Sequence, residues 1–473
     1  MTELWQLGAL DIASAIRKGE TSSREVLDAL LARVDAVNGD LNAIVKLIGD
    51  EASAAATAAD LAVADGDELG PLHGVPISVK ENIDIAGFPT TQGVPAFAEL
   101  VAPMDAPVVE RMRAAGAYPF ARTNMPDFGL RVHTDSSLHG LTRNPWRSDV
   151  TAGGSSGGEG SALASGMSPL GLGNDIGGSL RNPAHCNGIT SIKPTTGVIP
   201  RASSLPPEDT QITGQLMLSE GVMARHVADV RAGFLAVAGE HYRDPISIAA
   251  DLREPQPGRP LRVAVLADPP GGRTNPGIAQ AIGSTADALA GAGHHVEAAS
   301  PPTYLRAVEL WFLVLGADIN VARPFLEPFI GADGKRFLDL TREGVTDPTL
   351  DQWSLMFAER HGVARDWSAF FQEWDVLLSP TWAMPAFAHG ADIESADGAR
   401  AAIETIRPVL PANLLGLPAA VVPAAVVDGL PVGAQFTAAR FRDLTALAAA
   451  QAVEDLVGVF TPIAPVPATM QEA

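Results

Sequence analysis

Apolar side chains recur every three or four positions over the first 65 residues, which is the spacing of helices that bury one face. A first helix is predicted over residues 7–16 and is stopped by Gly19. The hydroxyl side chains of residues 21–23 can cap a second helix. The apolar face of this second helix comprises Val26, Leu27, Leu30, Leu31 and Val34. Alanine-rich residues 52–64 predict a third helix.

From residue 72 onward, strands alternate with helices. Val75, Ile77 and Val79 occupy every second position, which predicts a strand. Further strands are expected at residues 118–120, 261–266, 295–296, 375–378 and 419–422, and helices at 107–117, 277–292 and 443–456. Residues 151–178 are predicted to form a glycine- and serine-rich loop around a small-residue helix at 159–165. This alternation indicates an α/β fold.

One segment, residues 301–375, is unusually aromatic. It contains almost half of the Phe, Trp and Tyr residues of the chain, including Trp311, Phe312, Phe325, Phe329, Trp353, Phe357 and Trp374. An ordinary helical core would account for any one of these side chains. The more specific hypothesis is that an insertion over about 301–372 forms one wall of an apolar substrate pocket, as a cap over the site.

Composition, charge and the absence of targeting signals add four expectations. The 473 residues are 46% hydrophobic and no long polar linker divides them, so we expect a single large domain over 1–473. The formal net charge of -22 disfavours binding to nucleic acid or to an anionic membrane surface. The single cysteine, Cys186, excludes an internal disulfide. With no secretory signal at the start and no apolar run of about 20 residues, we expect a soluble, cytoplasmic protein.

The first candidate for chemistry is Ser179, which follows Asp175-Ile176-Gly177-Gly178. A serine after two glycines is often only a turn residue. However, two successive residues without Cβ let the backbone curl until several N–H groups point at one spot. Such an anion-binding nest is what the tetrahedral oxyanion of acyl transfer requires.

A second candidate, Ser155, lies in residues 153–158, which read Gly-Gly-Ser-Ser-Gly-Gly. The run matches the G-x-S-x-G nucleophile elbow, but that elbow needs a preceding strand and residues 144–149 do not read as one. A dinucleotide-binding loop is a poor match, because Gly171-Leu172-Gly173 begins the G-x-G-x-x-G pattern but Ile176 takes its third glycine position. A phosphate-binding P-loop lacks its Gly-Lys-Ser/Thr ending. The glycines are better explained by strained backbone around Ser155.

The third candidate, Lys80, ends the alternating strand that begins near Val75. An ammonium group at a buried strand end would be poorly hydrated, and the loss of solvation lowers the pKa of lysine. Lys80 could therefore act as a base near neutral pH. The ten histidines are scattered without H-E-x-x-H or C-x-x-C spacing, so we expect neither a metal nor a cofactor.

Together these segments resemble the amidase signature family. The resemblance rests on the lysine segment 72–83, on 123–128, on the central block 153–195, and on 413–418 and 429–433. It is weakest across 240–372 and strongest in a core of about 70–200. It implies a central mixed β-sheet covered by helices on both faces.

The resemblance also implies the roles of individual residues. Ser179 would be the nucleophile, Ser155 a proton relay with a cis peptide bond before it, and Lys80 the terminal base. Three further sets of residues are carried over: Ile176, Gly177 and Gly178 for the oxyanion hole, Asp175 and Arg181 for loop support, and Gly129 and Leu130 for the substrate pocket. Asn174 departs from the family, in which many relatives have Thr or Ser at this position.

These observations predict an amidase that acts on linear amides and cleaves small or medium substrates. Aryl amides, carbamates (urethanes) and some esters are within reach of the same apparatus. Two alternatives remain open. One is the amidase subunit of a glutamine-dependent tRNA amidotransferase; the other is a serine esterase that uses Ser155 with an Asp and a later His such as His389. Either a monomer or a homodimer is compatible with the family.

Overall fold

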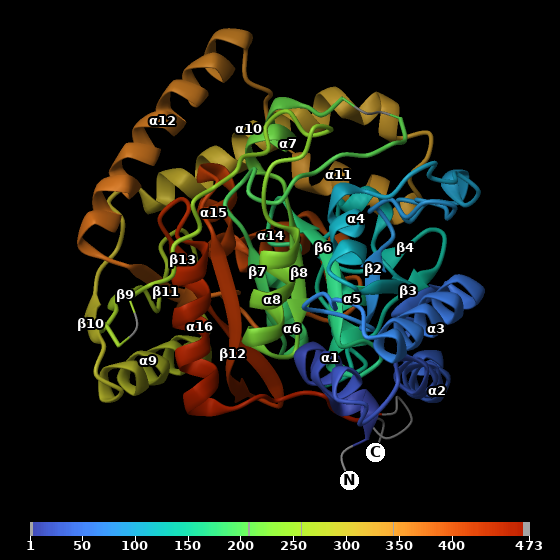
Figure 1. Cartoon of the computed structure of the whole chain (residues 1–473). Helices are drawn as coiled ribbons and strands as arrows, with labels where there is room; N and C mark the ends of the chain where they lie inside the picture. The colour runs from blue at the N-terminus through green and yellow to red at the C-terminus, as the bar shows by residue number, and fades with distance from the viewer. Residues whose placement is uncertain (1–2, 207–208, 257, 344, 467–473) are drawn as a thin grey trace.

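The computed structural model describes residues 3–206, 209–256, 258–343 and 345–466. A mixed sheet of eleven strands runs through it, in the order β1-β3-β2-β6-β8-β7-β12-β13-β11-β9-β10 (Figure 1). Its strands are β1 (Ile44–Leu47), β2 (Pro76–Lys80), β3 (Tyr118–Thr123), β6 (Leu170–Asp175), β7 (Thr190–Lys193), β8 (Ser219–Ala224), β9 (Arg262–Val265), β10 (His295–Ala298), β11 (Val376–Pro380), β12 (Ala419–Val427) and β13 (Leu430–Ala438). A separate pair is formed by β4 (Asp135–Ser136) and β5 (Gly140–Leu141).

Helices flank this sheet. They are α1 (Ala9–Arg17), α2 (Ser23–Leu41), α3 (Gly49–Asp65), α4 (Pro107–Ala114), α5 (Gly157–Ala164), α6 (Arg181–Asn187), α7 (Ile212–Met217), α8 (Val227–Val237), α9 (Pro276–Gly291), α10 (Tyr304–Leu326), α11 (Ala332–Arg342), α12 (Leu350–Glu373), α13 (Ala391–Glu394), α14 (Ala396–Thr405), α15 (Leu410–Leu415) and α16 (Asp443–Val457). Short 3-10 turns occur at Leu4–Gln6, Pro95–Phe97, Asp127–Gly129 and Arg407–Val409. No helix in the described ranges is long and apolar enough to cross a membrane.

Strand β6 shows how the sequence divides the two faces of the sheet. Side chains alternate between faces along a strand, and β6 begins Leu-Gly-Leu-Gly. Leu170 contacts the layer of α4 and α8, whereas a Cβ on Gly171 would overlap the Glu159 carboxylate of α5. Helices α8 and α16 lie in front of the sheet in Figure 1, and α5 and α6 lie behind it. The expected arrangement, a mixed sheet covered on both faces, is confirmed.

Most of the predicted elements are present. Ser22 caps α2 as expected, because its Oγ accepts the Glu25 N–H at 3.1 Å. The strand predicted from Val75 to Val79 is β2, and the C-terminal helix is α16. One prediction was wrong: the stretch expected to be loop around α5 includes the buried strand β6. Its glycines are strand residues that let α5 approach the sheet closely, a feature that periodicity alone does not reveal.

The aromatic segment is helical. Residues 301–372 contain α10, α11 and nearly all of α12, and α12 projects beyond the sheet at the upper left of Figure 1. Helix α10 packs on the short helix α15 and on α12. Several of its aromatic side chains belong to a second hydrophobic cluster that includes Trp311 and Trp367. This cluster also contains residues outside the segment, such as Leu377 of β11 and Leu410 of α15, so the segment shares its packed interior with the rest of the molecule.

Candidate active site

Lys80 ends strand β2 and its side chain is completely buried. Its Nζ lies 2.7 Å from the Ser155 Oγ and 2.9 Å from the Asn174 Oδ1. The Asn174 amide in turn donates to Asn82 at 3.0 Å. Asn174, which occupies a position that departs from the family, is therefore a direct hydrogen-bond partner of Lys80.

Burial controls the charge of this lysine. It lowers the pKa of Lys80 from 10.5 to about 7, although the negative charges of Glu220, Asp175 and Glu159 oppose that shift. Glu159 lies on α5 and binds the hydroxyls of Ser78 and Thr123. A substantial fraction of Lys80 is thus neutral at neutral pH, and a neutral amine can accept a proton.

Ser155 lies in a turn that packs tightly against residues 129–133. The Gly154–Ser155 peptide bond is cis, as the family resemblance implied. A Cβ on Gly154 would lie 2.6 Å from the Val132 carbonyl carbon, so only glycine fits there. Gly129 also approaches closely, because a Cβ on it would lie 3.1 Å from the Ser155 Oγ. Leu130 follows Gly129 and is half-buried, and the pocket-lining role of both residues stays a prediction.

The segments that carry the two serines are held together. The Ser156 N–H donates to the Ser179 carbonyl at 3.3 Å. The side-chain amide of Asn182 donates to the carbonyls of Gly154, at 3.2 Å, and Gly177, at 3.0 Å. Because both bridges connect the turn around Ser155 to the loop around Ser179, the three predicted catalytic residues share one region of the core.

The three N–H groups predicted to form the oxyanion hole, those of residues 176–178, differ in whether they already have a hydrogen-bond acceptor. The Gly178 N–H donates to the Asp175 Oδ1 at 2.7 Å. For the N–H groups of Ile176 and Gly177, no acceptor is found within the part of the chain that the structure describes. Ile176 and Gly177 are therefore the two predicted donors that are available to an oxyanion.

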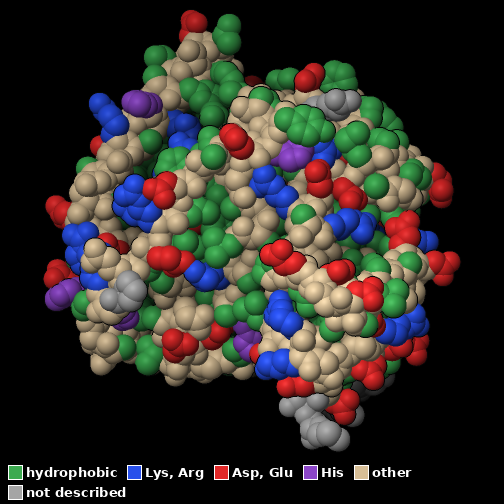
Figure 2. Space-filling view, viewed as in Figure 1, with side chains coloured by type: hydrophobic (Ala, Val, Ile, Leu, Met, Phe, Trp, Pro, Cys, Tyr) green, Lys and Arg blue, Asp and Glu red, His purple; other side chains and the backbone are tan. Residues whose placement is uncertain are grey.

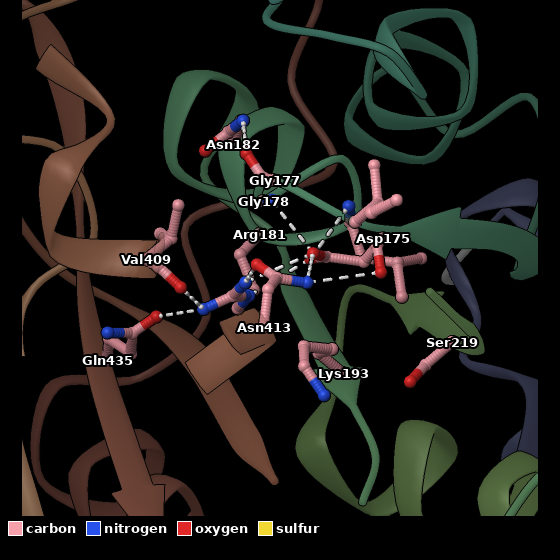
Figure 3. Close-up of polar contacts among 12 residues, drawn as sticks. Asp175, Gly177, Gly178, Arg181, Asn182, Lys193, Ser219, Val409, Asn413 and Gln435 are labelled. Atoms are coloured by element: carbon pink, nitrogen blue, oxygen red, sulfur yellow. Dashed lines mark hydrogen bonds and ion pairs between the residues drawn. The ribbon is translucent and has the colours of Figure 1, made fainter. Parts of the chain in front are cut away.

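The carboxylate of Asp175 is the centre of a hydrogen-bond network that holds this loop, as Figure 3 shows. Its carboxylate accepts hydrogen bonds from the backbone N–H groups of Gly178 and Leu180, from Nε and Nη2 of Arg181, each at 3.0 Å, and from Asn413 at 2.8 Å. Burial would raise the pKa of Asp175, but Arg181 and Asn413 outweigh it and lower the pKa to about 2. Asp175 is therefore a permanent anion at the base of the loop.

We expect Arg181→Met to reduce the free energy of unfolding by about 3–5 kcal/mol, because it leaves the buried Asp175 charge without its cation. Urea denaturation followed by tryptophan fluorescence measures the change. Arg24→Met is the matched control: Arg24 pairs with Asp28 at the surface, and its loss should cost less than about 1 kcal/mol. Equal losses for the two variants would contradict the supporting role of Arg181.

Sequence reasoning gave no role in the site to Asn182, Asn413 and Gln435, and it placed Trp311 only in a possible pocket wall. Asn413 and Gln435 bind Arg181, Asn182 bridges the loops, and Trp311 donates its indole N–H to the Ile176 carbonyl at 2.8 Å. Asn413 begins one of the motifs that carry the family resemblance, so that motif was a usable signal. Nothing in the sequence near Trp311 indicates its contact.

Within the described ranges, no hydrogen bond joins His389 to Ser155, as the alternative esterase site would require. The ring of His389 contacts the Ser148 carbonyl at 2.8 Å and packs against His133. Residues 144–149 form no strand, so the strand that a nucleophile elbow needs is missing before Ser155. Within the described ranges, no group of three or more His, Cys, Asp or Glu side chains is placed to hold a metal ion.

Comparison with known proteins places these observations in context. The amidase family model matches residues 25–447. The chain is 41% identical over 464 residues to an indoleacetamide hydrolase of Bradyrhizobium diazoefficiens, across 96% of this chain and 87% of that protein. It is also 37% identical over 483 residues to one subunit of the glutamyl-tRNA(Gln) amidotransferase of Deinococcus radiodurans, across 94% of this chain and 96% of that protein.

Solved structures agree with the fold. A bacterial aryl acylamidase of the amidase signature family superposes with a TM-score of 0.84 at 26% identity, over 97% of both chains. The 6-aminohexanoate cyclic dimer hydrolase superposes with a TM-score of 0.82 at 28% identity, over 99% of this chain and all of that one.

Proposed function

This chain belongs to the amidase signature family, and from that premise we propose that it hydrolyses small aromatic amides through an acyl-enzyme on Ser179. The observation that carries the proposal is the 2.7 Å contact between Lys80 and Ser155, in a segment tied to the loop that presents Ser179 and two available backbone donors. A base, a relay, a nucleophile and an anion cradle are the parts that acyl transfer needs.

The proposed reaction begins when neutral Lys80 accepts the proton of Ser155 as Ser155 accepts the proton of Ser179. The Ser179 oxygen then bonds to the substrate carbonyl carbon, and the N–H groups of Ile176 and Gly177 stabilise the negative oxygen. The relay returns a proton to the leaving nitrogen as the C–N bond breaks. Water attacks the resulting ester by the same route and releases the acid, which regenerates Ser179.

Two findings favour an aromatic substrate. The Bradyrhizobium relative is an indoleacetamide hydrolase and a structural relative is an aryl acylamidase. In this chain, the aromatic helix α10 reaches the nucleophile loop, where the Trp311 ring lies against Gly177. The aromatic helix therefore packs directly behind the loop that carries the proposed nucleophile.

Substrate choice is tested by product release without glutamine. We expect the purified chain to release ammonia from indole-3-acetamide and arylamine from acetanilide, with slower cleavage of a matching phenyl carbamate. The carbamate is slower because its second oxygen donates electrons to the carbonyl and makes it less electrophilic. Ratios of kcat/KM rank the three substrates. Cleavage of none of them, with active glutaminase instead, would contradict the proposal.

The second candidate is a role as one component of a tRNA amidotransferase, favoured by the 37% identity to the Deinococcus protein. The charge of -22 counts against a role beside tRNA. On the face drawn in Figure 2, Lys and Arg side chains are interspersed with Asp and Glu and do not gather into one patch. Glutamine hydrolysis that requires partner proteins would support this candidate.

A further inference from the structure

The Trp311 side chain makes two contacts with the nucleophile loop. Its indole N–H donates to the Ile176 carbonyl at 2.8 Å. Its six-membered ring covers Gly177 so closely that a Cβ on Gly177 would lie 2.6 Å from the Trp311 Cζ2. Trp311 is only 6% exposed, so both contacts lie in the interior.

The hydrogen bond to Ile176 determines where the next N–H points. The Ile176 carbonyl and the Gly177 N–H belong to one peptide group, which is planar and, unlike Gly154–Ser155, trans. In a trans peptide the C=O and the N–H point in opposite directions. Holding the Ile176 oxygen toward α10 therefore turns the Gly177 N–H away from α10, and this N–H is one of the two available donors.

The following peptide is held in a different way. The Gly177 carbonyl is bound by Asn182, whose side-chain oxygen accepts the Trp382 indole N–H at 2.7 Å, and the Gly178 N–H is bound by Asp175. For the Ile176–Gly177 peptide, Trp311 is the one hydrogen-bond donor to the carbonyl within the described ranges. The aromatic helix α10 thus supplies a support that the rest of the loop lacks.

We propose that Trp311 is a positioning residue for the amidase reaction: it orients the Ile176–Gly177 peptide so that the Gly177 N–H faces the oxyanion. Helix α10, which carries Trp311, packs on α15. Helix α15 in turn carries Asn413, whose side-chain amide donates a hydrogen bond to Asp175. The aromatic insertion consequently affects the chemical step. The proposal rests on the proposed Ser179 acyl-enzyme.

The test replaces the donor and keeps an aromatic ring. Trp311→Phe is expected to lower kcat for acetanilide about 10- to 100-fold with KM changed less than about 2-fold, because the donor stabilises the transition state more than the ground state. The inhibition constant of phenylboronic acid, whose serine adduct is tetrahedral, should weaken by a similar factor. A residue with a purely structural role would not weaken the tetrahedral adduct selectively.

Trp367→Phe is the matched control. Trp367 lies in the same insertion, on α12, and is just as buried, but its indole nitrogen has no hydrogen-bond partner among the described residues. We expect its kcat to stay within about 3-fold of wild type. If Trp311→Phe is poorly folded, 3-benzothienylalanine at position 311 keeps the shape of the indole and removes only the N–H.

Two results would overturn the proposal. One is an increase in KM at unchanged kcat, which would make Trp311 a pocket wall only; the other is equal loss of kcat in Trp311→Phe and Trp367→Phe. Failure of the underlying acyl-enzyme is detected separately, by mass spectrometry of wild type after reaction with a fluorophosphonate. Labelling away from Ser179 would reject the proposed function, whereas labelling on Ser179 leaves the Trp311 result to be judged alone.

Discussion

Ser179→Ala is expected to lower kcat/KM for acetanilide by about 10⁴-fold or more, because the variant has no oxygen with which to form the acyl-enzyme. The loss should appear in kcat, since the backbone donors of the loop still bind the substrate carbonyl. Arylamine release under saturating substrate measures it. A fluorophosphonate should label wild type on the peptide that contains Ser179 and leave the variant unlabelled.

Ser191→Ala serves as the control for this experiment. Ser191 is a buried serine of β7 whose hydroxyl has no hydrogen-bond partner in the part of the chain that the structure describes, so its replacement removes the same atom without touching the proposed reaction. Activity of Ser191→Ala should match wild type. Activity retained by Ser179→Ala would mean that another serine attacks the carbonyl, and Ser155 would then be the next candidate.

Lys80→Met is expected to lower kcat/KM by about 10³-fold, within the range found when a general base is lost. Methionine has a similar length and no titratable amine. In wild type, the neutral lysine is the active form and burial lowers its pKa to about 7. The logarithm of kcat/KM should therefore rise with pH up to about 7 and be flat above it, and a pH series of arylamine release measures this profile.

The acidic groups around Lys80 also influence the pH at which this profile bends. Glu159 of α5, Glu220 of β8 and Asp175 of β6 all raise the pKa of the lysine, and burial raises the pKa of both glutamates to about 7. The inflection in the pH profile is thus expected to reflect the coupled titration of Lys80 and these carboxyl groups. Lys193→Met is the control: burial likewise lowers the pKa of Lys193 to about 7, yet its amine bonds to the Pro194 carbonyl. An inflection that vanished with Lys193 instead of Lys80 would contradict the assignment.

Local patterns predicted much of the fold correctly. The capping residue Ser22 and the apolar spacing after it specify α2, since both signals act within one or two turns of helix. The alternation that ends at Lys80 specifies β2 in the same way. Strand β6 was missed because its glycines look like loop residues until the close approach of α5 is known.

In the candidate site, too, local sequence signals identify some residues and long-range contacts identify the others. By itself, the sequence singled out Lys80, Ser155 and Ser179 as candidates, because the glycines around both serines and the apolar strand before the lysine are neighbours along the chain. Only the tertiary structure decided which groups support them. Asn413 reaches Asp175 from 238 residues away, and Trp311 reaches Ile176 from 135 residues away. Such contacts depend on how α10 and α15 pack against the loop, and the direction of a backbone N–H follows from that packing and not from the identity of its residue.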